Sequence, residues 1–349
     1  RLKGPEVVTV PEDGKNRLLA ALYGPTSSGK TAMAVRIAQR IEDEFGLQVV
    51  VISADSRQVY QYMDIGTSKT TDEEMGGIRH EMLDVTEPVR KFELEEYARL
   101  ARRHISEAFA AGSVPFVVGG TGVYLSAVLG GWDVDKVGAA RASLRRDFPR
   151  SAASDAYATL RRLNPGHAAR VHPNNYEATI NALAAVMSAD GGSARQRADE
   201  GSARQRADEA AGEAATLMLG LDPGARVLDQ RVAGTYDRQV QRGLFEEVKS
   251  LAARYGLDRE FQQRGRDSQN QVLHTHGYRE YFEVAAKRGK PVANLTEPDL
   301  AEVRSQVIER IQRHTRRQRG WFGKLPGTRM AGSADRAIAL VRRQLAAGR

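Results

Sequence analysis

Residues 24–31, GPTSSGKT, constrain the fold of this chain most, because they match the phosphate-loop pattern G-x-x-x-x-G-K-[ST]. The apolar run LLAALY precedes them and a segment with helical apolar spacing follows, so the sequence predicts strand, loop and helix. Backbone N–H groups at the start of such a helix surround phosphate oxygens, and the lysine adds a positive charge. The pattern predicts a diphosphate site but does not identify the compound. Its expected binding residues are Gly24, Thr26, Ser27, Ser28, Gly29, Lys30 and Thr31, of which Thr31 can also reach Mg²⁺.

The alternation of strand and helix continues after the phosphate loop. Residues 47–56 and 114–124 each read as a buried strand that runs into small polar or glycine residues. This alternation predicts an α/β fold, a P-loop NTPase-like parallel sheet flanked by helices, with a helical insertion and a helical C-terminal region. The expected segments are a lead-in over 1–17, the α/β core over 18–135, the insertion over 136–190, a linker over 191–215 that contains the duplicated nonapeptide GSARQRADE, a core return with a helical region over 216–326, and a C-terminal helix or tail over 327–349.

Composition narrows the function classes. The 349 residues include 52 Lys and Arg against 44 Asp and Glu, a formal charge of +8 that permits a polyanionic partner without demonstrating one. Cysteine is absent, which excludes disulfides, thiolate catalysis and cysteine-based zinc sites. No apolar run approaches the roughly 18–20 residues of a membrane span, and residues 1–17 lack the apolar centre of a secretory signal. We therefore expect a cytoplasmic enzyme without a membrane partner.

Two strand ends carry further candidate residues. Asp55 follows the strand over 47–53, and a carboxylate at the carboxyl edge of a parallel sheet can bind Mg²⁺ or act as a general base, although a helix N-cap explains it equally well. Thr121 lies in the glycine-rich turn GGTG after the strand VPFVV, where it could donate to a phosphate oxygen. His80 and Asp84 are four residues apart, but a hydrogen bond within the loop explains them better than a metal pair.

Taken together, several motifs resemble those of the tRNA dimethylallyltransferases. They are GPTSSGKT, DSRQVYQYMDIGTSK, HEMLDV, GGTGVYL, ARVHPNN, GLFEEV, GYREY and RRQRGWF, and they occur in that family's order over roughly residues 18–322. The resemblance implies that the phosphate loop holds the diphosphate of dimethylallyl diphosphate, and that the prenyl group is transferred rather than a phosphoryl group. The acceptor would be the amine of an adenosine adjacent to the anticodon, which must leave its stack to enter the protein.

The resemblance also assigns roles to residues. Asp55 would be the general base, Thr121 a catalytic diphosphate contact, and Thr31 with Asp55 the ligands of a Mg²⁺ cofactor. The expected partners are dimethylallyl diphosphate and a tRNA anticodon stem-loop, and we expect a monomer. The candidates for holding the adenine or the flanking RNA are Ser56, Arg57, Gln58, Tyr60, Arg316, Arg317 and Gln318, and for Tyr60 core packing is an equal alternative.

Three stretches depart from the family pattern. After HPN the chain carries Asn175, Ala178 and Asn181, where the family has an aspartate and two arginines. The helix before GLFEEV has Thr235 in place of an arginine that contacts diphosphate, and Arg238, almost one turn later, could reach the same face. In the family stretch T-R-x-Y-A-K-R-Q, Gln312 replaces the first arginine.

These departures keep two alternatives open. An adenylate isopentenyltransferase, which uses free AMP, ADP or ATP, would fit Ala178, Asn181 and Gln312, because these residues replace arginines in segments expected near the RNA. A non-catalytic RNA-binding paralogue would fit the threonine at position 235, but the intact Lys30, Thr31, Asp55 and Thr121 oppose it. An ordinary P-loop kinase would need a second acidic strand end, and VPFVVGGTG ends without a carboxylate.

Overall fold

The computed structural model describes residues 18–129, 134–169, 171–189, 215–323 and 328–347. The expected lead-in over 1–17 and the duplicated nonapeptide lie outside these residues. The described chain divides into two compact units. The first contains residues 18–92 and 100–125 and everything described from residue 215 onward, and the second contains residues 93–99 and the helices that follow residue 126.

A parallel sheet forms the centre of the first unit. Its strands, in the spatial order β3-β2-β4-β1-β5-β6, all run in the same direction. The predicted parallel α/β fold is therefore confirmed. Because every strand ends at the same edge, the loops after β1, β2 and β4 meet there. The strands are β1 Leu18–Tyr23, β2 Val49–Ser53, β3 Arg79–Glu81, β4 Val114–Gly119, β5 Ala215–Gly220 and β6 Arg329–Met330.

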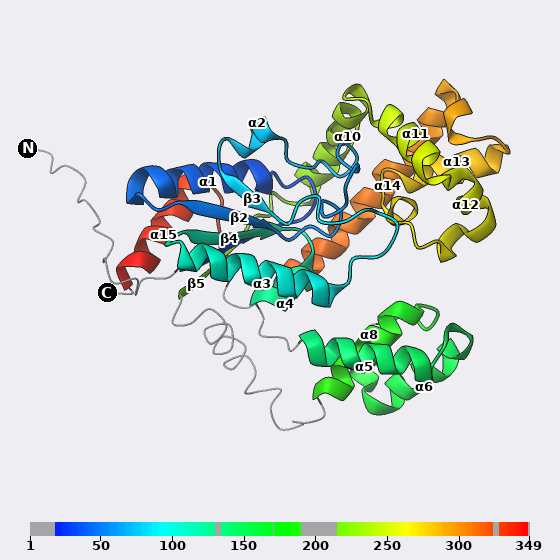
Figure 1. Cartoon of the computed structure of the whole chain (residues 1–349), viewed down its shortest axis with the longest axis horizontal. Coiled ribbons are helices and arrows are strands. Elements are labelled where there is room, and N and C mark those ends of the chain that lie inside the picture. Colours follow the sequence, from blue (N-terminus) through cyan, green and yellow to red (C-terminus); the bar gives the residue numbers. More distant parts are fainter. Residues whose placement is uncertain (1–17, 130–133, 170, 190–214, 324–327, 348–349) are drawn as a thin grey trace, which may run out of the picture. The chain divides into compact units, whose positions relative to one another are not determined.

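Helices α1 and α15 cover one face of this sheet (Figure 1). Leu18, Ala20 and Leu22 of β1 share a core cluster with Ile37 of α1 and Val341 of α15. The intervening residues of β1 are equally buried, so both faces of the strand are covered, which explains its continuous apolar sequence. The flanking elements of this unit are α1 Lys30–Phe45, α2 Asp72–Met75, α3 Leu94–Ala110, α4 Gly122–Leu129 and α15 Ala334–Ala347, with the first residues of α3 and the last of α4 assigned to the second unit.

The remaining helices of the first unit gather beyond the carboxyl ends of the strands (Figure 1). The longest of them, α14, begins with a capping box in which Thr296 and Asp299 satisfy each other's backbone N–H groups. It packs against both α10 and α13. These helices are α10 Ala225–Gln241, α11 Leu244–Tyr255, α12 Leu257–Arg264, α13 Arg279–Arg288 and α14 Glu297–Phe322, and short 3₁₀ helices lie at Gly265–Asp267, Gln271–His274 and Val292–Asn294.

The second unit is helical, as its Ala-rich sequence suggests. Leu144, Leu160 and Leu183, from three different helices, meet in one core. The buried Arg141 donates to Asn181 and pairs with Glu95, so Asn181, one of the departures from the family pattern, serves a contact within this unit. The helices are α5 Val134–Asp147, α6 Ala153–Leu163, α7 Pro165–Ala168 and α8 Tyr176–Ala189, with a 3₁₀ turn at Arg150–Ala152.

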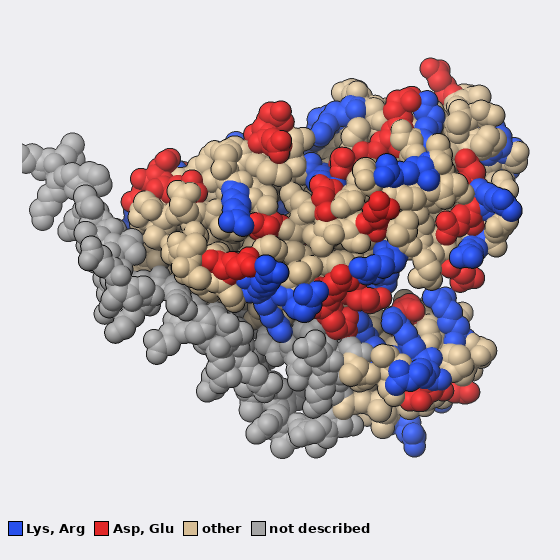
Figure 2. Space-filling view, viewed as in Figure 1, with Lys and Arg blue, Asp and Glu red and all other residues tan. Residues whose placement is uncertain are grey.

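Charged side chains of both signs are interspersed over the face shown in Figure 2. The net charge of +8 is therefore not gathered into a single basic surface on this face. Among the described helices, none combines the length and the apolar character needed to cross a bilayer.

Candidate functional site

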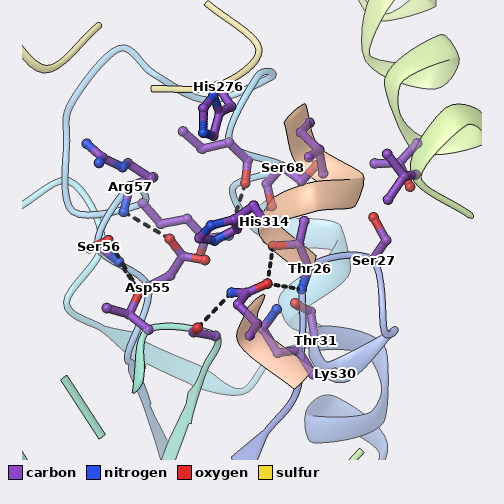
Figure 3. A pocket seen from close by; sticks show the side chains of 18 of the residues that line it. Thr26, Ser27, Lys30, Thr31, Asp55, Ser56, Arg57, Ser68, His276 and His314 are labelled. Atoms are coloured by element: carbon purple, nitrogen blue, oxygen red, sulfur yellow. Dashed lines mark hydrogen bonds between the residues drawn. The ribbon is translucent and has the colours of Figure 1, made fainter. Parts of the chain in front are cut away.

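A cavity of about 1370 Å³ lies at the carboxyl edge of the sheet, between the strand ends and helices α10 and α14. This volume exceeds the roughly 300–1,000 Å³ of a typical small-molecule pocket, so the cavity can take two ligand groups side by side. Its walls come from the phosphate loop, the loops after β2 and β4, and the two helices. Figure 3 shows the side chains that converge on it.

The phosphate loop takes the conformation that its sequence predicts. Ser27 and Gly29 have positive φ angles of 62° and 87°, which turn the chain sharply into the first residue of α1. A side chain at Gly24 would place its Cβ 2.5 Å from the carbonyl oxygen of Leu221, so only glycine fits there. Lys30 and Thr31 both line the cavity at the helix start, where backbone N–H groups favour an anion.

The loops after β2 and β4 touch one another because these strands are neighbours in the sheet. Asp55 accepts a hydrogen bond from the backbone N–H of Arg57 at 2.9 Å. Thr121 accepts one from the N–H of Ser56 at 3.0 Å and donates its own N–H to the carbonyl of Ala54 at 3.1 Å. The two catalytic candidates, Asp55 and Thr121, both line the cavity and are held on neighbouring loops by these bonds.

The C-terminal part of α14 forms a wall of the cavity and contacts the phosphate loop. The side-chain oxygen of Gln318 accepts from the N–H of Thr26 at 2.9 Å and from its hydroxyl at 3.1 Å. The amide nitrogen of Gln318 donates to the carbonyl of Gly120 at 2.7 Å. Phe322 stacks on Tyr23 with ring centroids 5.0 Å apart. One helix thus joins the phosphate loop to the loop after β4.

Helix α10 brings arginines to the cavity. Arg231 donates to the carbonyl of Ser28, in the phosphate loop, at 3.0 Å. Arg238 folds back along the helix and donates to the hydroxyl of Thr235 at 3.1 Å. Arg242 also lines the cavity. Within the described part of the chain, neither Arg238 nor Arg242 lies within ion-pair distance of a carboxylate, so their charge remains available to an anionic ligand.

A single carboxylate anchors the loop over residues 64–66. Glu247 of α11 accepts hydrogen bonds from all three backbone N–H groups, at 2.8–3.1 Å, and from the hydroxyl of Tyr278 at 2.6 Å. Gln239 of α10 donates to the carbonyl of Gly66 and to the hydroxyl of Ser68. Helices α10 and α11 therefore set the position of this wall of the cavity.

Burial lowers the pKa of two basic groups in the site. Desolvation lowers the pKa of the Lys30 ammonium, and the nearby Asp55 carboxylate only partly offsets this. Desolvation, with added repulsion from His276 and Arg317, lowers the pKa of His314 to about 4. His314 is therefore neutral at pH 7, next to the carboxylate of Asp55 (Figure 3). An anion bound at the phosphate loop would favour the charged form of Lys30.

The cavity residues suit Mg²⁺ only together with a substrate. Thr31 and Asp55 both line the cavity, and Asp55 uses just one carboxylate oxygen for the N–H of Arg57. Among the described residues there is no group of three or more His, Asp or Glu side chains that could hold a metal ion. His80 bonds the carbonyl of Ile78, and Asp84 pairs with Lys69, so they form no metal pair. Mg²⁺ is commonly held by one or two carboxylates plus substrate phosphates, which matches this arrangement.

Most of the residues that the sequence singles out converge on the cavity. Its lining contains Thr26, Ser27, Gly29, Lys30, Thr31, Asp55, Ser56, Arg57, Gln58, Thr121, Arg238, Arg317 and Gln318. Gly24 and Ser28 lie behind the loop surface rather than in the lining. Two expected base or RNA contacts are placed elsewhere. Tyr60 is 2% exposed and its hydroxyl accepts from the N–H of Phe92, while Arg316 lies outside the lining, 3.6 Å from Asp229.

Sequence reasoning missed several lining residues. His274, His276 and His314 reach the cavity from the segments HTHGYRE and RHTRRQ, which the sequence marks only as basic and aromatic. Gln239 and Trp321 also line it. No spacing rule could have found them, because helices α10 and α14 must first be packed before these side chains share a wall. Gln312, which replaces a family arginine, donates to the carbonyl of Asp229 at 3.3 Å and does not line the cavity.

Comparison with known proteins identifies sequence relatives over most of the chain. The sequence pattern of the IPP transferase family matches residues 58–325. The tRNA dimethylallyltransferase of Roseiflexus sp. (strain RS-1) is 33% identical over 314 residues, which is 88% of this chain and 90% of that enzyme. The tRNA dimethylallyltransferase of Geobacillus thermodenitrificans (strain NG80-2) is also 33% identical, over 87% of each chain.

A solved structure gives the same result. The tRNA isopentenylpyrophosphate transferase of Bacillus halodurans aligns with a TM-score of 0.61 and 28% sequence identity, covering 95% of this chain and 98% of that one. A eukaryotic dimethylallyltransferase shares the fold, with a TM-score of 0.63 at 21% identity.

Proposed function

Because the chain belongs to the IPP transferase family, whose relatives transfer a prenyl group to tRNA, we propose that it moves a dimethylallyl group from dimethylallyl diphosphate to the exocyclic amine of the adenosine adjacent to the anticodon. One observation carries this proposal: the phosphate loop, Asp55 and Thr121 line one cavity that is large enough for a diphosphate and a base together. The diphosphate site lies at the start of α1, and the acceptor base faces the end of β2.

The donor site rests on charge and backbone geometry. Lys30, the first turn of α1 and Thr121 surround the place of the diphosphate, and Arg231 lies against the same loop through the carbonyl of Ser28. Arg238 is proposed to supply the charge that the family places at position 235, because its guanidinium is bonded to the Thr235 hydroxyl. Thr31 and Asp55 would hold Mg²⁺, which neutralises charge that grows on the departing diphosphate.

In the proposed reaction, the adenine amine attacks the first allylic carbon as the bond from that carbon to the bridging oxygen breaks. The diphosphate takes the electron pair of the broken bond, and its growing charge is met by donors already in place. Asp55 accepts the proton that the amine loses. Its carboxylate is oriented for this by the N–H of Arg57, and the neutral His314 beside it adds no further positive charge that would weaken the carboxylate as a base.

RNA is favoured over a free nucleotide as the acceptor by the arginines around the cavity. Arg57, Arg238, Arg242 and Arg317 line it, and the described carboxylates lie outside ion-pair distance of all four. Unpaired cations at the edge of a base-sized cavity suit the phosphates that flank a flipped nucleotide. A free adenine nucleotide, whose own phosphates would engage fewer of these four arginines, is the second candidate.

A transfer assay tests the proposal. Purified protein, labelled dimethylallyl diphosphate and Mg²⁺ are incubated in parallel with an anticodon stem-loop that contains the adenosine, with AMP, with ATP, and without an acceptor. We expect label on the stem-loop alone. Label on AMP or ATP alone would instead establish the nucleotide-using alternative. A stem-loop that binds without receiving label would indicate a non-catalytic paralogue.

A further inference from the structure

Tyr62 combines two properties that are unusual for a tyrosine. Its φ angle of 65° lies in the left-handed region, which costs a bulky residue of the order of 1 kcal/mol or more. It is also 41% exposed, whereas the other Phe, Tyr and Trp side chains that the structure describes are buried or half-buried. Of the other non-glycine residues with a positive φ, Ser27 and Ser68 line the cavity, whereas Met82 and Asp84 do not.

The surroundings of Tyr62 hold it in this conformation. Two residues before it, the carbonyl of Tyr60 accepts from the buried ammonium of Lys69 at 2.7 Å. Two residues after it, the N–H of Asp64 is bound by Glu247, and the carboxylate of Asp64 pairs with the same Lys69. The backbone on both sides of Tyr62 is thus fixed by buried or multiply bonded groups, so the ring is presented to solvent from a rigid support.

An arginine extends the aromatic surface. The guanidinium carbon of Arg254 lies 3.8 Å from the centroid of the Tyr62 ring, which is a stacking distance. The same guanidinium is 5.7 Å from the ring of Tyr255 and 4.0 Å from the carboxylate of Glu87. The distance to Glu87 is at the limit of an ion pair, and about half of the Arg254 side chain remains exposed, so its charge is only partly compensated.

This surface lies within a few residues of the cavity wall along the chain. Gln58 and Gly66, each four residues from Tyr62, line the cavity. Four residues span at most about 14 Å, so a nucleotide next to one held in the cavity can reach the ring. Unpaired RNA bases are recognised by stacking on aromatic rings and on guanidinium planes, and the same guanidinium attracts the phosphate.

We propose that Tyr62 and Arg254 form a stacking site for an unpaired RNA base that flanks the adenosine in the cavity. This site rests on the proposed function, since it needs an RNA acceptor, and it adds a contact outside the reaction cavity. It selects a looped, single-stranded neighbour, because a paired base cannot present its face to the ring. Tyr62 is a positioning residue here and takes no part in the chemistry.

The test measures RNA binding separately from transfer. Anticodon stem-loops carry the fluorescent base 2-aminopurine at one of the positions flanking the adenosine, and binding is followed with the wild-type protein, Tyr62→Asn and Tyr62→Phe. Asparagine removes the ring and suits the left-handed backbone, so it does not penalise the fold at this position. We expect Tyr62→Asn to weaken stem-loop binding about 5- to 150-fold and to abolish the fluorescence change at one flanking position. Tyr62→Phe should bind as the wild type does.

The matched control is Val89→Ala, which removes a similarly exposed apolar side chain of the same unit. It should leave RNA binding unchanged, and no variant should change the KM for dimethylallyl diphosphate. Equal affinity of Tyr62→Asn and wild type, or equal losses in Tyr62→Asn and Tyr62→Phe, would overturn the stacking site alone. A wild-type protein that prenylates AMP but binds no stem-loop would overturn the RNA acceptor, and with it the stacking site.

Discussion

The guanidinium of Arg238 donates a hydrogen bond of 3.1 Å to the hydroxyl of Thr235, one helical turn earlier on α10. This bond turns the arginine back along the helix, so that its Nη1 atom lies about 3.5 Å from where a Cβ of Gly234 would be. The positive charge therefore lies beside Thr235, the position at which the resemblance leads us to expect an arginine. The hydroxyl of Thr235 thus holds the Arg238 guanidinium in this position.

Arg238→Gln is expected to raise the KM for dimethylallyl diphosphate about 10- to 100-fold, because a charged hydrogen bond contributes about 1.5–3 kcal/mol. Steady-state kinetics at saturating stem-loop measure this. Arg226→Gln, on the same helix but outside the cavity lining, is the matched control and should have no effect. The double variant Thr235→Arg with Arg238→Gln should recover most of the loss. A normal KM in Arg238→Gln would show that Arg231 already suffices.

Asp55→Asn is expected to lower kcat by about 10²- to 10⁴-fold, because the amine proton loses its acceptor. The asparagine oxygen can still accept from the N–H of Arg57, so the loop should keep its shape. Stem-loop affinity, measured by filter retention, should stay within about threefold. Asp335→Asn, which alters an exposed carboxylate paired with Arg40, is the control. Turnover at the wild-type rate would remove Asp55 from the role of base.

Gln318→Glu is expected to impair donor binding more than Gln318→Ala. A carboxylate cannot donate to the carbonyl of Gly120, and its charge would repel the diphosphate near Thr26. The measurement is the KM for dimethylallyl diphosphate with each variant. Gln306→Ala, which removes a glutamine of the same helix bonded to Glu302, should leave this KM unchanged. If Gln318→Ala raised this KM more than Gln318→Glu, the hydrogen bonds of the side chain to Thr26 and Gly120 would matter more than the repulsion from an added carboxylate.

Glu247→Gln is expected to destabilise the protein by about 2–4 kcal/mol, since it removes a charge that accepts four hydrogen bonds. Urea unfolding measures the loss. Because Gly66 and Ser68 line the cavity, the KM for the stem-loop should rise as well. Glu246→Gln provides the control, because Glu246 is the neighbouring residue and pairs with Lys249 on the surface. Equal stability of the two variants would contradict the anchoring role of Glu247.

Glu280 gives the protein an acid-sensitive contact. Burial raises the pKa of its carboxyl, but hydrogen bonds from His276 and from the N–H of Gly277 outweigh burial, so the net pKa lies below 4.5. A carboxyl with a lowered pKa stabilises the fold above the unfolded-state pKa and loses this contribution as pH falls through the folded-state value. We therefore expect Glu280→Gln to cost about 3 kcal/mol at pH 7.

The difference between wild type and Glu280→Gln should shrink as pH falls below about 4.5. Urea unfolding at pH 7, 5 and 3.5 measures it. A difference that stays constant down to pH 3.5 would mean that the charge of Glu280 adds nothing to stability, and that the substitution acts through packing alone.

Local sequence was sufficient to predict the parallel sheet and the phosphate loop, because each depends on residues within one strand, turn and helix. It was also sufficient to place Asp55 and Thr121 at strand ends that face one cavity. The bond between Thr26 and Gln318 joins residues 292 positions apart, and no local pattern encodes it. The burial of Tyr60 could not be predicted either, because Tyr60 lies in an irregular segment whose apolar residues follow neither the strand nor the helix periodicity.

The order of strands in the sheet has a consequence for the growing chain. β1 occupies the interior of the sheet, yet β5, its partner on one side, is made about 200 residues later, after the whole second unit. At a synthesis rate of about 5–20 residues per second, one edge of β1 stays unpaired for roughly 10–40 s. Long-range parallel pairing is also slow to form once both strands exist. During this interval the phosphate loop at the end of β1 is attached to a sheet that lacks one of the two strands that pair with β1.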